Sequence, residues 1–211
     1  MMQRIPHPDN IGSTLQDPEE YYEKHKKRAQ SQFKSFLKQI RKLGIKGRYL
    51  EIGSGPGILA SMVTSSFPEI QITAVELSSD VIDLGKKHIK EMSMENRIQF
   101  VQGNTEDETF MSSLGQFDLV YSTFSLHHWK NPEQALRLMV NAVDKNGTSM
   151  IFDFKRVWWL YYHPKHTGFM NSVRASYLPK EMKRMFKNIG IQNYKIRTPF
   201  PFFWQIITIQ K

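Results

Sequence analysis

Short apolar segments alternate with helix-like patterns through the middle of this chain, and this alternation restricts the fold more than any other feature of the sequence. Strands are expected at residues 49–52, 70–75, 98–101, 118–122 and 149–154, and helices at residues 58–65, 80–92 and 132–143. A strand, a helix and a second strand form the βαβ unit, whose strands run parallel beneath the helix. We therefore expect an α/β fold with a doubly wound, mostly parallel sheet and helices on both faces.

The two ends of the chain follow different patterns. Residues 1–18 are rich in Pro, Asp, Asn and Gly without periodicity, which predicts an extended arm or loop. From Pro18 to Gly44, apolar residues recur at spacings of three and four, which predicts an amphipathic helix. A helix is also expected over residues 179–189, followed by strands at 192–197 and 203–209. Because only residues 198–202 separate these strands, we expect an antiparallel pair at the sheet edge.

Two dipeptides indicate boundaries within the core. Asn131-Pro132 suits a helix start, with asparagine as the N-cap and proline at the first helical position. Asn146-Gly147 suits the turn before the next strand.

Composition excludes several classes of chemistry. With 211 residues and 40% apolar content, the chain is long enough for one substantial core but short for two domains. It contains no cysteine, so disulfides, thiolate metal sites and a cysteine nucleophile are excluded, and we expect no metal site. No apolar run reaches bilayer length and the first residues lack the apolar stretch of a signal peptide, so a cytoplasmic protein without stable membrane insertion is expected.

The net charge of +9 is distributed unevenly. Residues 1–50 carry a net charge of +6, residues 51–154 carry −7, and residues 155–211 carry +10 with Glu181 as their only acidic side chain. If the two basic ends converge, they would attract an anionic substrate, a nucleic acid or an acidic membrane surface. The alternative is that these lysines only solvate helix faces.

A glycine-rich segment follows the first strand of the expected core. It reads EIGSGPG at residues 51–57 and leads directly into a helix. Glycine lets the backbone turn tightly and approach a ligand closely, and the N–H groups of a helix N-terminus face such a ligand. The segment therefore predicts a ligand-binding turn.

Here the chain resembles the class I, Rossmann-like S-adenosylmethionine-dependent methyltransferases, whose first motif is an acidic residue followed by Gly-x-Gly-x-Gly. Glu51, Gly53, Gly55 and Gly57 occupy these positions. The resemblance implies that the turn wraps the amino acid part of the cofactor S-adenosylmethionine. It also implies that Glu51 lies near the ammonium group of the cofactor, often through water.

Three further segments match the family in the same order, and the resemblance runs from about Tyr21 to Lys211. Glu76 ends the next strand, where a carboxylate accepts hydrogen bonds from both ribose hydroxyls. Asn104 replaces the family's aspartate, which accepts a hydrogen bond from the adenine amino group; an amide oxygen can also accept it. Residues 116–129 match the fourth strand and the active-site loop. The cofactor-binding residues expected from the resemblance are Tyr22, Glu51, Gly53, Ser54, Gly55, Gly57, Glu76, Leu77, Asn104, Thr105 and Ser122.

Two other classes of protein fit part of the sequence. Gly55, Gly57 and Ala60 satisfy a loose dinucleotide-binding fingerprint, as in an NAD-dependent oxidoreductase, but Glu51 has no role in that fingerprint. The closing hairpin also belongs to the methyltransferase topology. A non-catalytic cofactor-binding or RNA-binding module is the second alternative, because a fold alone does not establish turnover.

Methyl transfer requires an acceptor lone pair aligned with the departing sulfur, in a pocket that excludes water. A base is needed only if the acceptor must lose a proton, and His127 and His128 are the candidate catalytic residues. Either histidine has an alternative structural role, as a helix cap or as packing beneath the loop.

Residues 156–169 are dense in aromatic side chains with basic neighbours, and the resemblance implies that they form a lid over the acceptor site. Aromatic walls with a basic rim suit a small aromatic or apolar substrate that bears negative charge. The substrate-binding candidates are Tyr161, Tyr162, Lys165 and Arg174. Some of the aromatic side chains are expected only to pack the lid against the sheet.

Within the enzyme class, RNA methylation is the main alternative to a small-molecule substrate, given the basic ends. The chain lacks the cysteine of carbon-5 pyrimidine methyltransferases, and residues 121–124 lack the Asn/Asp-Pro-Pro-Tyr/Phe motif of enzymes acting on exocyclic base nitrogens. We therefore expect a small-molecule substrate and one methyltransferase domain over residues 1–211. Its expected parts are an N-terminal arm and helix (1–47), a cofactor-binding core (48–154), a lid (155–178), and a C-terminal helix and hairpin (179–211).

Overall fold

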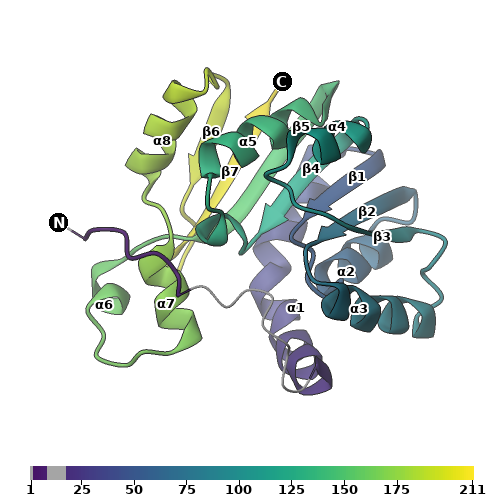
Figure 1. Ribbon diagram of the computed structural model, residues 1–211, viewed down its shortest axis with the longest axis horizontal. Coiled ribbons are helices and arrows are strands. Elements are labelled where there is room, and N and C mark those ends of the chain that lie inside the picture. Colours follow the sequence, from purple (N-terminus) through teal and green to yellow (C-terminus); the bar gives the residue numbers. More distant parts are fainter. Residues whose placement is uncertain (1, 9–17) are drawn as a thin grey trace.

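The computed structural model describes residues 2–8 and 18–211 (Figure 1). Residues 2–8 form neither helix nor strand. Residues 9–17, the remainder of the expected arm, lie outside the described residues. The described helices include none that is both long and apolar enough to cross a bilayer.

The described chain folds around one seven-stranded sheet with the order β3-β2-β1-β4-β5-β7-β6. The strands are β1 (Gly47–Ile52), β2 (Ile70–Glu76), β3 (Ile98–Gln102), β4 (Phe117–Thr123), β5 (Val143–Phe154), β6 (Tyr194–Arg197) and β7 (Trp204–Gln210). The first five strands are parallel, whereas β7 pairs antiparallel with both β5 and β6. The expected doubly wound sheet with a terminal antiparallel hairpin is confirmed.

Helices cover both faces of the sheet (Figure 1). They are α1 (Pro18–Leu43), α2 (Ile58–Ser66), α3 (Ser79–Glu91), α4 (Glu108–Ser113), α5 (Pro132–Asn141), α6 (Trp158–Tyr161), α7 (Gly168–Ala175) and α8 (Pro179–Asn188), with a short 3₁₀ turn, η1 (Leu126–His128). Helices α1, α2 and α3 pack on one face around Phe36, Val63 and Phe152, and helices α5 and α8 pack on the other around Leu136 and Phe186. The central strands are buried on both faces, which explains their nearly continuous apolar sequences.

Local signals in the sequence explain most element boundaries. Gly44 ends α1 in the left-handed conformation, with φ +64° and its N–H donating to the carbonyl of Ile40. Asn131 caps α5 as expected, because its side chain accepts a hydrogen bond from the N–H of Gln134. The expected turn at Asn146-Gly147 is wrong, because both residues lie inside β5.

The close approach of two strands explains the position of Gly147. Strands β4 and β5 change register between Phe117 and Leu119, which accommodates the extra residues of β5. A Cβ atom on Gly147 would lie 2.7 Å from the carbonyl oxygen of Asp118. Glycine is therefore used here for close contact between strands and not for a turn.

The strand order places the functional loops at one edge of the sheet. The chain leaves the five parallel strands at the same edge, and the order reverses between the neighbouring strands β1 and β4. Ligands of open α/β sheets bind at the carboxyl ends of the strands, at such a switch point. The glycine-rich turn after β1 lies there.

Candidate active site

The glycine-rich turn is held against the end of β2 by backbone hydrogen bonds. The N–H groups of Gly53 and Ser54 both donate to the carbonyl of Val75, at 2.9 and 3.0 Å. Gly53, Gly55 and Gly57 have φ values of +67°, +54° and +73°, a region that favours glycine. The three glycines therefore allow the chain to pass from β1 into α2 within a few residues.

The space around each of these glycines differs. A Cβ atom on Gly53 would lie 2.3 Å from the hydroxyl oxygen of Ser125, and one on Gly57 would lie 2.6 Å from the ring of Phe100. No described atom lies within 4 Å of a Cβ atom built on Gly55. Gly53 and Gly57 thus serve packing, whereas the backbone of Gly55 borders open space where a ligand can approach.

The carboxylate of Glu76 bridges the turns that follow β1 and β2. Its Oε2 accepts from the N–H of Gly55 at 2.9 Å, and its Oε1 accepts from the N–H groups of Leu77 and Ser78 at 2.9 and 3.2 Å. Carboxylate oxygens have about four lone-pair sites together, so this carboxylate retains acceptor capacity for a ligand. The neighbouring Leu77 is 53% exposed and offers an apolar surface beside it.

Glu51 is a buried carboxyl group close to the glycine-rich turn. The hydroxyl of Tyr121 donates to its Oε2 at 3.1 Å, and no described lysine or arginine forms an ion pair with it. Burial, together with the charge of Glu76, raises the pKa of Glu51 to about 8 although the Tyr121 hydrogen bond acts in the other direction. A cationic ligand group at this carboxyl would stabilise its ionised form.

Two other expected cofactor-binding side chains make hydrogen bonds within the protein. The amide oxygen of Asn104 accepts from the N–H of Glu106 at 2.9 Å and stabilises the turn after β3. The hydroxyl of Ser122 is fully buried and donates to the carbonyl of Ile52 at 3.0 Å, which joins β4 to β1. Asn104 is exposed at the carboxyl edge of the sheet. The side chain of Ser122 is buried and does not reach this edge.

The remaining expected cofactor residues lie near the same edge. Ser54 is buried in the turn, with its hydroxyl donating to the carbonyl of Gly55 at 3.3 Å, and Thr105 is half-buried after β3. Tyr22 lies in α1 and is buried against α2 and α3. Its ring stacks on that of His88, with 3.5 Å between the ring centroids.

A buried carboxylate and imidazole pair lies at the ends of β4 and β5. Nδ1 of His127 lies 2.7 Å from Oδ1 of Asp153, and both side chains are 1% exposed. The carboxylate is oriented by the backbone, because Oδ2 accepts from the N–H of His127 and Oδ1 also accepts from the N–H of Phe154. Nε2 of His127 is buried without a hydrogen-bond partner among the described residues.

The N-terminal segment 2–8 lies against this pair. Arg4 donates to the carbonyl oxygens of His127 and Ala175, at 3.0 and 2.7 Å. The His7 ring lies 4.5 Å, centroid to centroid, from the ring of His128. Burial, with the charges of His127, His7 and Arg4, lowers the pKa of His128 to about 3, so its imidazole is neutral near pH 7.

Some of the lid residues form hydrogen bonds within the protein, and others are exposed. Arg174 is buried, and its guanidinium donates to the carbonyl oxygens of Tyr161 and His163 at 3.1 and 2.5 Å. It therefore holds the lid backbone together instead of facing a substrate. The Tyr161 hydroxyl donates to the carbonyl of Gln3 at 2.8 Å, whereas Tyr162 and Lys165 are exposed.

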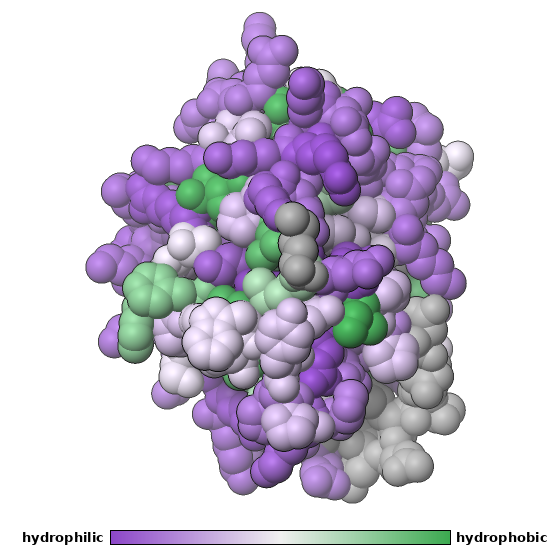
Figure 2. Space-filling view, turned by 90° about the vertical axis from the view of Figure 1, so that its left-hand side faces the viewer, coloured by the Kyte–Doolittle hydropathy of each residue, from purple (hydrophilic) through white to green (hydrophobic). Residues whose placement is uncertain are grey.

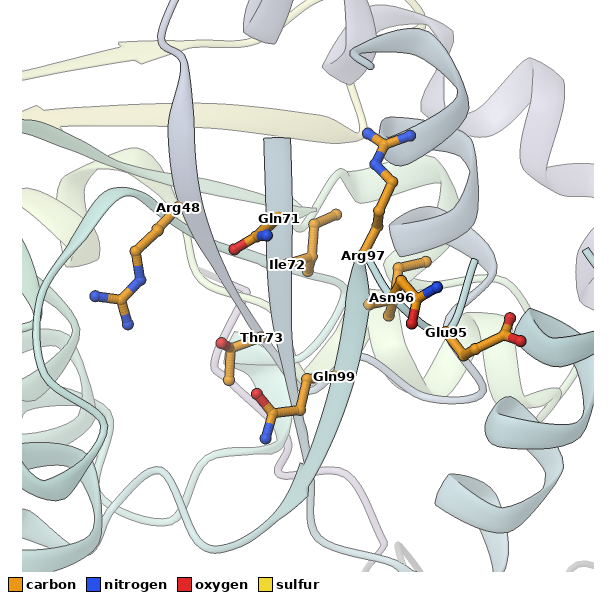
Figure 3. Close-up of a pocket in the computed structure, with 9 residues that line it drawn as sticks. Arg48, Gln71, Ile72, Thr73, Glu95, Asn96, Arg97 and Gln99 are labelled. Atoms are coloured by element: carbon orange, nitrogen blue, oxygen red, sulfur yellow. The ribbon is translucent and has the colours of Figure 1, made fainter. Parts of the chain in front are cut away.

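A polar hollow of about 410 Å³ lies away from this site (Figure 3). It is lined from the amino-terminal halves of β1, β2 and β3, and Figure 3 shows Thr73 and Gln99 on the strands with Arg48 across the hollow. Because the glycine-rich turn lies at the carboxyl ends of the strands, we assign the active site to the turn and not to the hollow.

Three residues that contact the predicted site residues were not predicted from the sequence. Asp153 is an acidic residue among apolar ones in residues 150–154 of β5, which is a usable signal, but its pairing with His127 depends on the tertiary structure. Tyr121 and His7 gave no local signal of their contacts with Glu51 and His128.

The structure contains the features that the resemblance to class I methyltransferases predicts: a doubly wound sheet with an antiparallel β7, a glycine-rich turn after β1 and a carboxylate at the end of β2. The family model for a methyltransferase domain matches residues 50–151. Over these residues, the resemblance to the class I S-adenosylmethionine-dependent methyltransferases that the sequence motifs predict is confirmed.

Individual relatives agree with this assignment. The chain is 28% identical over 108 residues to the demethylmenaquinone methyltransferase of Porphyromonas gingivalis, covering 51% of this chain and 43% of the relative. It is 30% identical over 105 residues to the malonyl-[acyl-carrier protein] O-methyltransferase of Priestia megaterium, covering 50% of this chain and 36% of the relative. The chain thus spans less than half the length of these relatives.

A solved structure extends the likeness to nearly the whole chain. The S-adenosylmethionine-dependent methyltransferase of Aquifex aeolicus superposes with a TM-score of 0.70 at 13% identity, covering 92% of this chain and 98% of that one. At this identity the likeness shows the fold.

Proposed function

We propose that this chain is an enzyme that binds S-adenosylmethionine at the glycine-rich turn and transfers its methyl group to a small aromatic or apolar acceptor that can bear negative charge. The observation that carries the proposal is the open space at Gly55, bordered by the carboxyl group of Glu76. Glu51, Gly53, Ser54, Gly57 and the other expected cofactor residues lie around the same turn or on the neighbouring strands and helices.

The chemistry of the two acidic residues fits the proposed cofactor. Glu51 is buried without a described cationic partner, and the cofactor carries an ammonium group that can pair with it. Glu76 is held in place by three backbone N–H groups and retains about one acceptor position for a ribose hydroxyl. Bound S-adenosylmethionine supplies a methyl group that is already activated by the positive sulfur.

The buried pair explains how this chain would handle an acceptor that must lose a proton. Because an ionised carboxylate only accepts hydrogen bonds, Asp153 holds the tautomer of His127 that has a proton on Nδ1. Nε2 is then the free basic nitrogen, and it is the atom that takes the proton of an O–H or N–H acceptor. Asp153 acts as a positioning residue, because it touches only His127 and backbone groups.

The lid supports the proposed class of acceptor. Phe154 lies beside both His127 and Phe169, with ring centroids 5.7 and 5.4 Å apart, so aromatic side chains border the histidine. Such walls exclude water and suit a flat or apolar substrate. Tyr161, Tyr162 and Lys165 remain the candidates for contact with it.

The two relatives described above favour a small-molecule acceptor over RNA. They are named for demethylmenaquinone and for a malonyl group on a carrier protein. Neither name involves a nucleic acid, and the low identity leaves the acceptor of this chain open to direct measurement.

Calorimetric titration tests the cofactor assignment. We expect binding of S-adenosylmethionine and of its demethylated product, and none of NADH. Glu76→Gln should weaken both affinities, whereas Glu95→Gln, at the exposed polar hollow, should not. Binding of NADH alone, or equal affinities in the two variants, would refute the assignment.

Acceptors are then sought with methyl-labelled S-adenosylmethionine. Transfer of label to anionic aromatic compounds is the expected result. Label transferred only to RNA would replace the proposed acceptor class, and cofactor binding with no transfer to any acceptor would indicate a non-catalytic module.

A further inference from the structure

Large aromatic side chains are exposed on the face of the molecule that carries the lid. The set, here called the aromatic surface, comprises Trp158, Trp159, Tyr162, Phe200 and Phe202, which are 67%, 43%, 65%, 79% and 51% exposed. Figure 2 shows this face, where pale and green side chains gather among hydrophilic ones in its middle and lower part. Exposed apolar groups of this size mark an interaction site more often than chance.

Two segments far apart in the sequence form the aromatic surface side by side. The N–H of Lys155, just before α6, donates to the carbonyl of Phe203 at 2.7 Å. The Phe169 ring, at the start of α7, lies 5.8 Å from the Phe203 ring, centroid to centroid. The turn between β6 and β7 is therefore attached to the lid, and its aromatic side chains extend the surface of α6.

The side chains of the aromatic surface match a water–lipid boundary. Trp and Tyr combine an apolar ring with a polar group, and they are enriched where one end of a side chain is apolar and the other is hydrated. Phe200 and Phe202 lie on the tip of a hairpin, with ring centroids 5.7 Å apart. A projecting hairpin tip can enter the headgroup region without a change in the packing of the sheet.

The charged residues within the two segments that form the aromatic surface, residues 155–169 and 197–203, are all basic. Lys165 lies in the loop between α6 and α7, and Arg197 ends β6 beside the hairpin turn; both are exposed. Residues 155–211 carry 11 basic side chains and one acidic side chain, Glu181, which pairs with Arg156 inside the protein. This charge is complementary to anionic headgroups, each basic residue near such a surface contributing about 1 kcal/mol of attraction.

We propose that the aromatic surface docks this protein on the surface of an anionic lipid bilayer. Trp158, Phe200 and Phe202 enter the interfacial layer, and Lys165 and Arg197 contact lipid phosphates. The docked face includes the lid beside His127, so docking brings the proposed acceptor site to the bilayer. Docking itself does not depend on methyl transfer, and its test does not require turnover.

The test is flotation of the full chain with lipid vesicles. We expect binding to vesicles of phosphatidylcholine mixed with phosphatidylglycerol, weaker binding to phosphatidylcholine alone, and release by high salt. Trp158→Ser with Phe200→Ser should abolish binding, because both side chains are exposed and their replacement leaves the core intact. Met92→Ser, at an exposed methionine after α3, is the matched control and should bind as the unaltered protein does.

A second set of variants tests the contribution of charge to vesicle binding separately from that of apolar contact. Lys165→Glu with Arg197→Glu should lower the partition coefficient on anionic vesicles by at least about 10-fold. The control, Lys90→Glu on the exposed side of α3, should change it little. Circular dichroism and S-adenosylmethionine affinity verify that each variant is folded.

Several outcomes would overturn the proposal. They are no binding to anionic vesicles, equal and salt-independent binding to both vesicle types, or equal loss of binding in the control variants. Self-association that disappears with Trp158→Ser and Phe200→Ser, in a protein that binds no vesicle, would assign the aromatic surface to contact between copies of the chain. Binding of single-stranded RNA that excludes vesicles would assign it to nucleic acid.

Discussion

The imidazole Nδ1 of His127 lies 2.7 Å from Oδ1 of Asp153, in a buried position at the carboxyl ends of β4 and β5. Three hydrogen bonds orient the carboxylate: one from the ring and two from the N–H groups of His127 and Phe154. The backbone therefore orients the carboxylate, which in turn orients the ring. This arrangement leaves Nε2 as the one nitrogen of His127 without a hydrogen-bond partner among the described residues.

Asp153→Asn should reduce methyl transfer by about 10²-fold or more, because an amide favours the wrong tautomer of His127. The affinity for S-adenosylmethionine, measured by calorimetry, should stay unchanged, since the hydrogen bonds of Asp153 are with His127 and Phe154 and not with the glycine-rich turn. His127→Gln should show a similar loss. A normal rate in Asp153→Asn, with an unaltered pH profile, would contradict the role of the pair.

The buried carboxyl of Glu51 should make the empty protein less stable as the pH rises. Its pKa is about 8 in the folded protein and 4.5 ordinarily, so unfolding releases its proton between these values. Stability should then decrease as the pH rises from about 4.5 to 8, by at most about 5 kcal/mol. Glu51→Gln should remove this dependence in urea unfolding and weaken S-adenosylmethionine binding. A flat stability profile in the unaltered protein would disprove the burial effect.

Substitutions at Gly55 and Gly57 should differ in effect: the first should mainly weaken ligand binding, and the second should mainly disturb packing. Gly57→Ala should destabilise the fold by about 2 kcal/mol or more, because its Cβ meets the Phe100 ring at 2.6 Å and φ is +73°. Gly55→Ala has open space, so its stability loss should be only about 1 kcal/mol, while its S-adenosylmethionine affinity should decrease more. Phe100→Leu should partly restore the stability of Gly57→Ala. Equal effects of both glycine variants on affinity would contradict this division.

The neutral His128 should destabilise the protein in acid. Its pKa of about 3 in the folded protein lies below the ordinary 6.5, so the unfolded chain takes up a proton that the folded chain excludes. Stability should therefore decrease as the pH falls from 6.5 toward 3. Urea unfolding at pH 7 and pH 5 measures the effect, which His128→Phe should reduce and His25→Gln, at an exposed position of α1, should retain.

Periodicity in the sequence predicted the core strands and long helices to within about two residues, except that β5 begins at Val143, six residues before the expected strand. The short elements α4, α6 and α7 were not predicted, because each spans too few turns for a periodic pattern. The prediction of a turn at Asn146-Gly147 was wrong for another reason. The local signal for a turn was overridden by a bulge in which Gly147 contacts β4.

In the candidate site, too, some residues could be predicted from the sequence and others could not. Gly53, Gly55, Gly57 and Glu76 could be predicted as site residues because they lie in contiguous segments whose spacing implies a mechanism. Arg174 was expected to face a substrate, but it binds lid carbonyl groups, because a buried guanidinium takes the nearest acceptors.

By itself the sequence determined the α/β class, the parallel sheet and the glycine-rich turn, because these follow from patterns within short stretches of chain. Only the tertiary structure decided which distant groups meet. Asp153 pairs with His127 across 26 residues, Tyr121 with Glu51 across 70, and Arg4 with the His127 carbonyl across 123. Such contacts are set by the order of strands in the sheet, where residues far apart along the chain emerge at one edge.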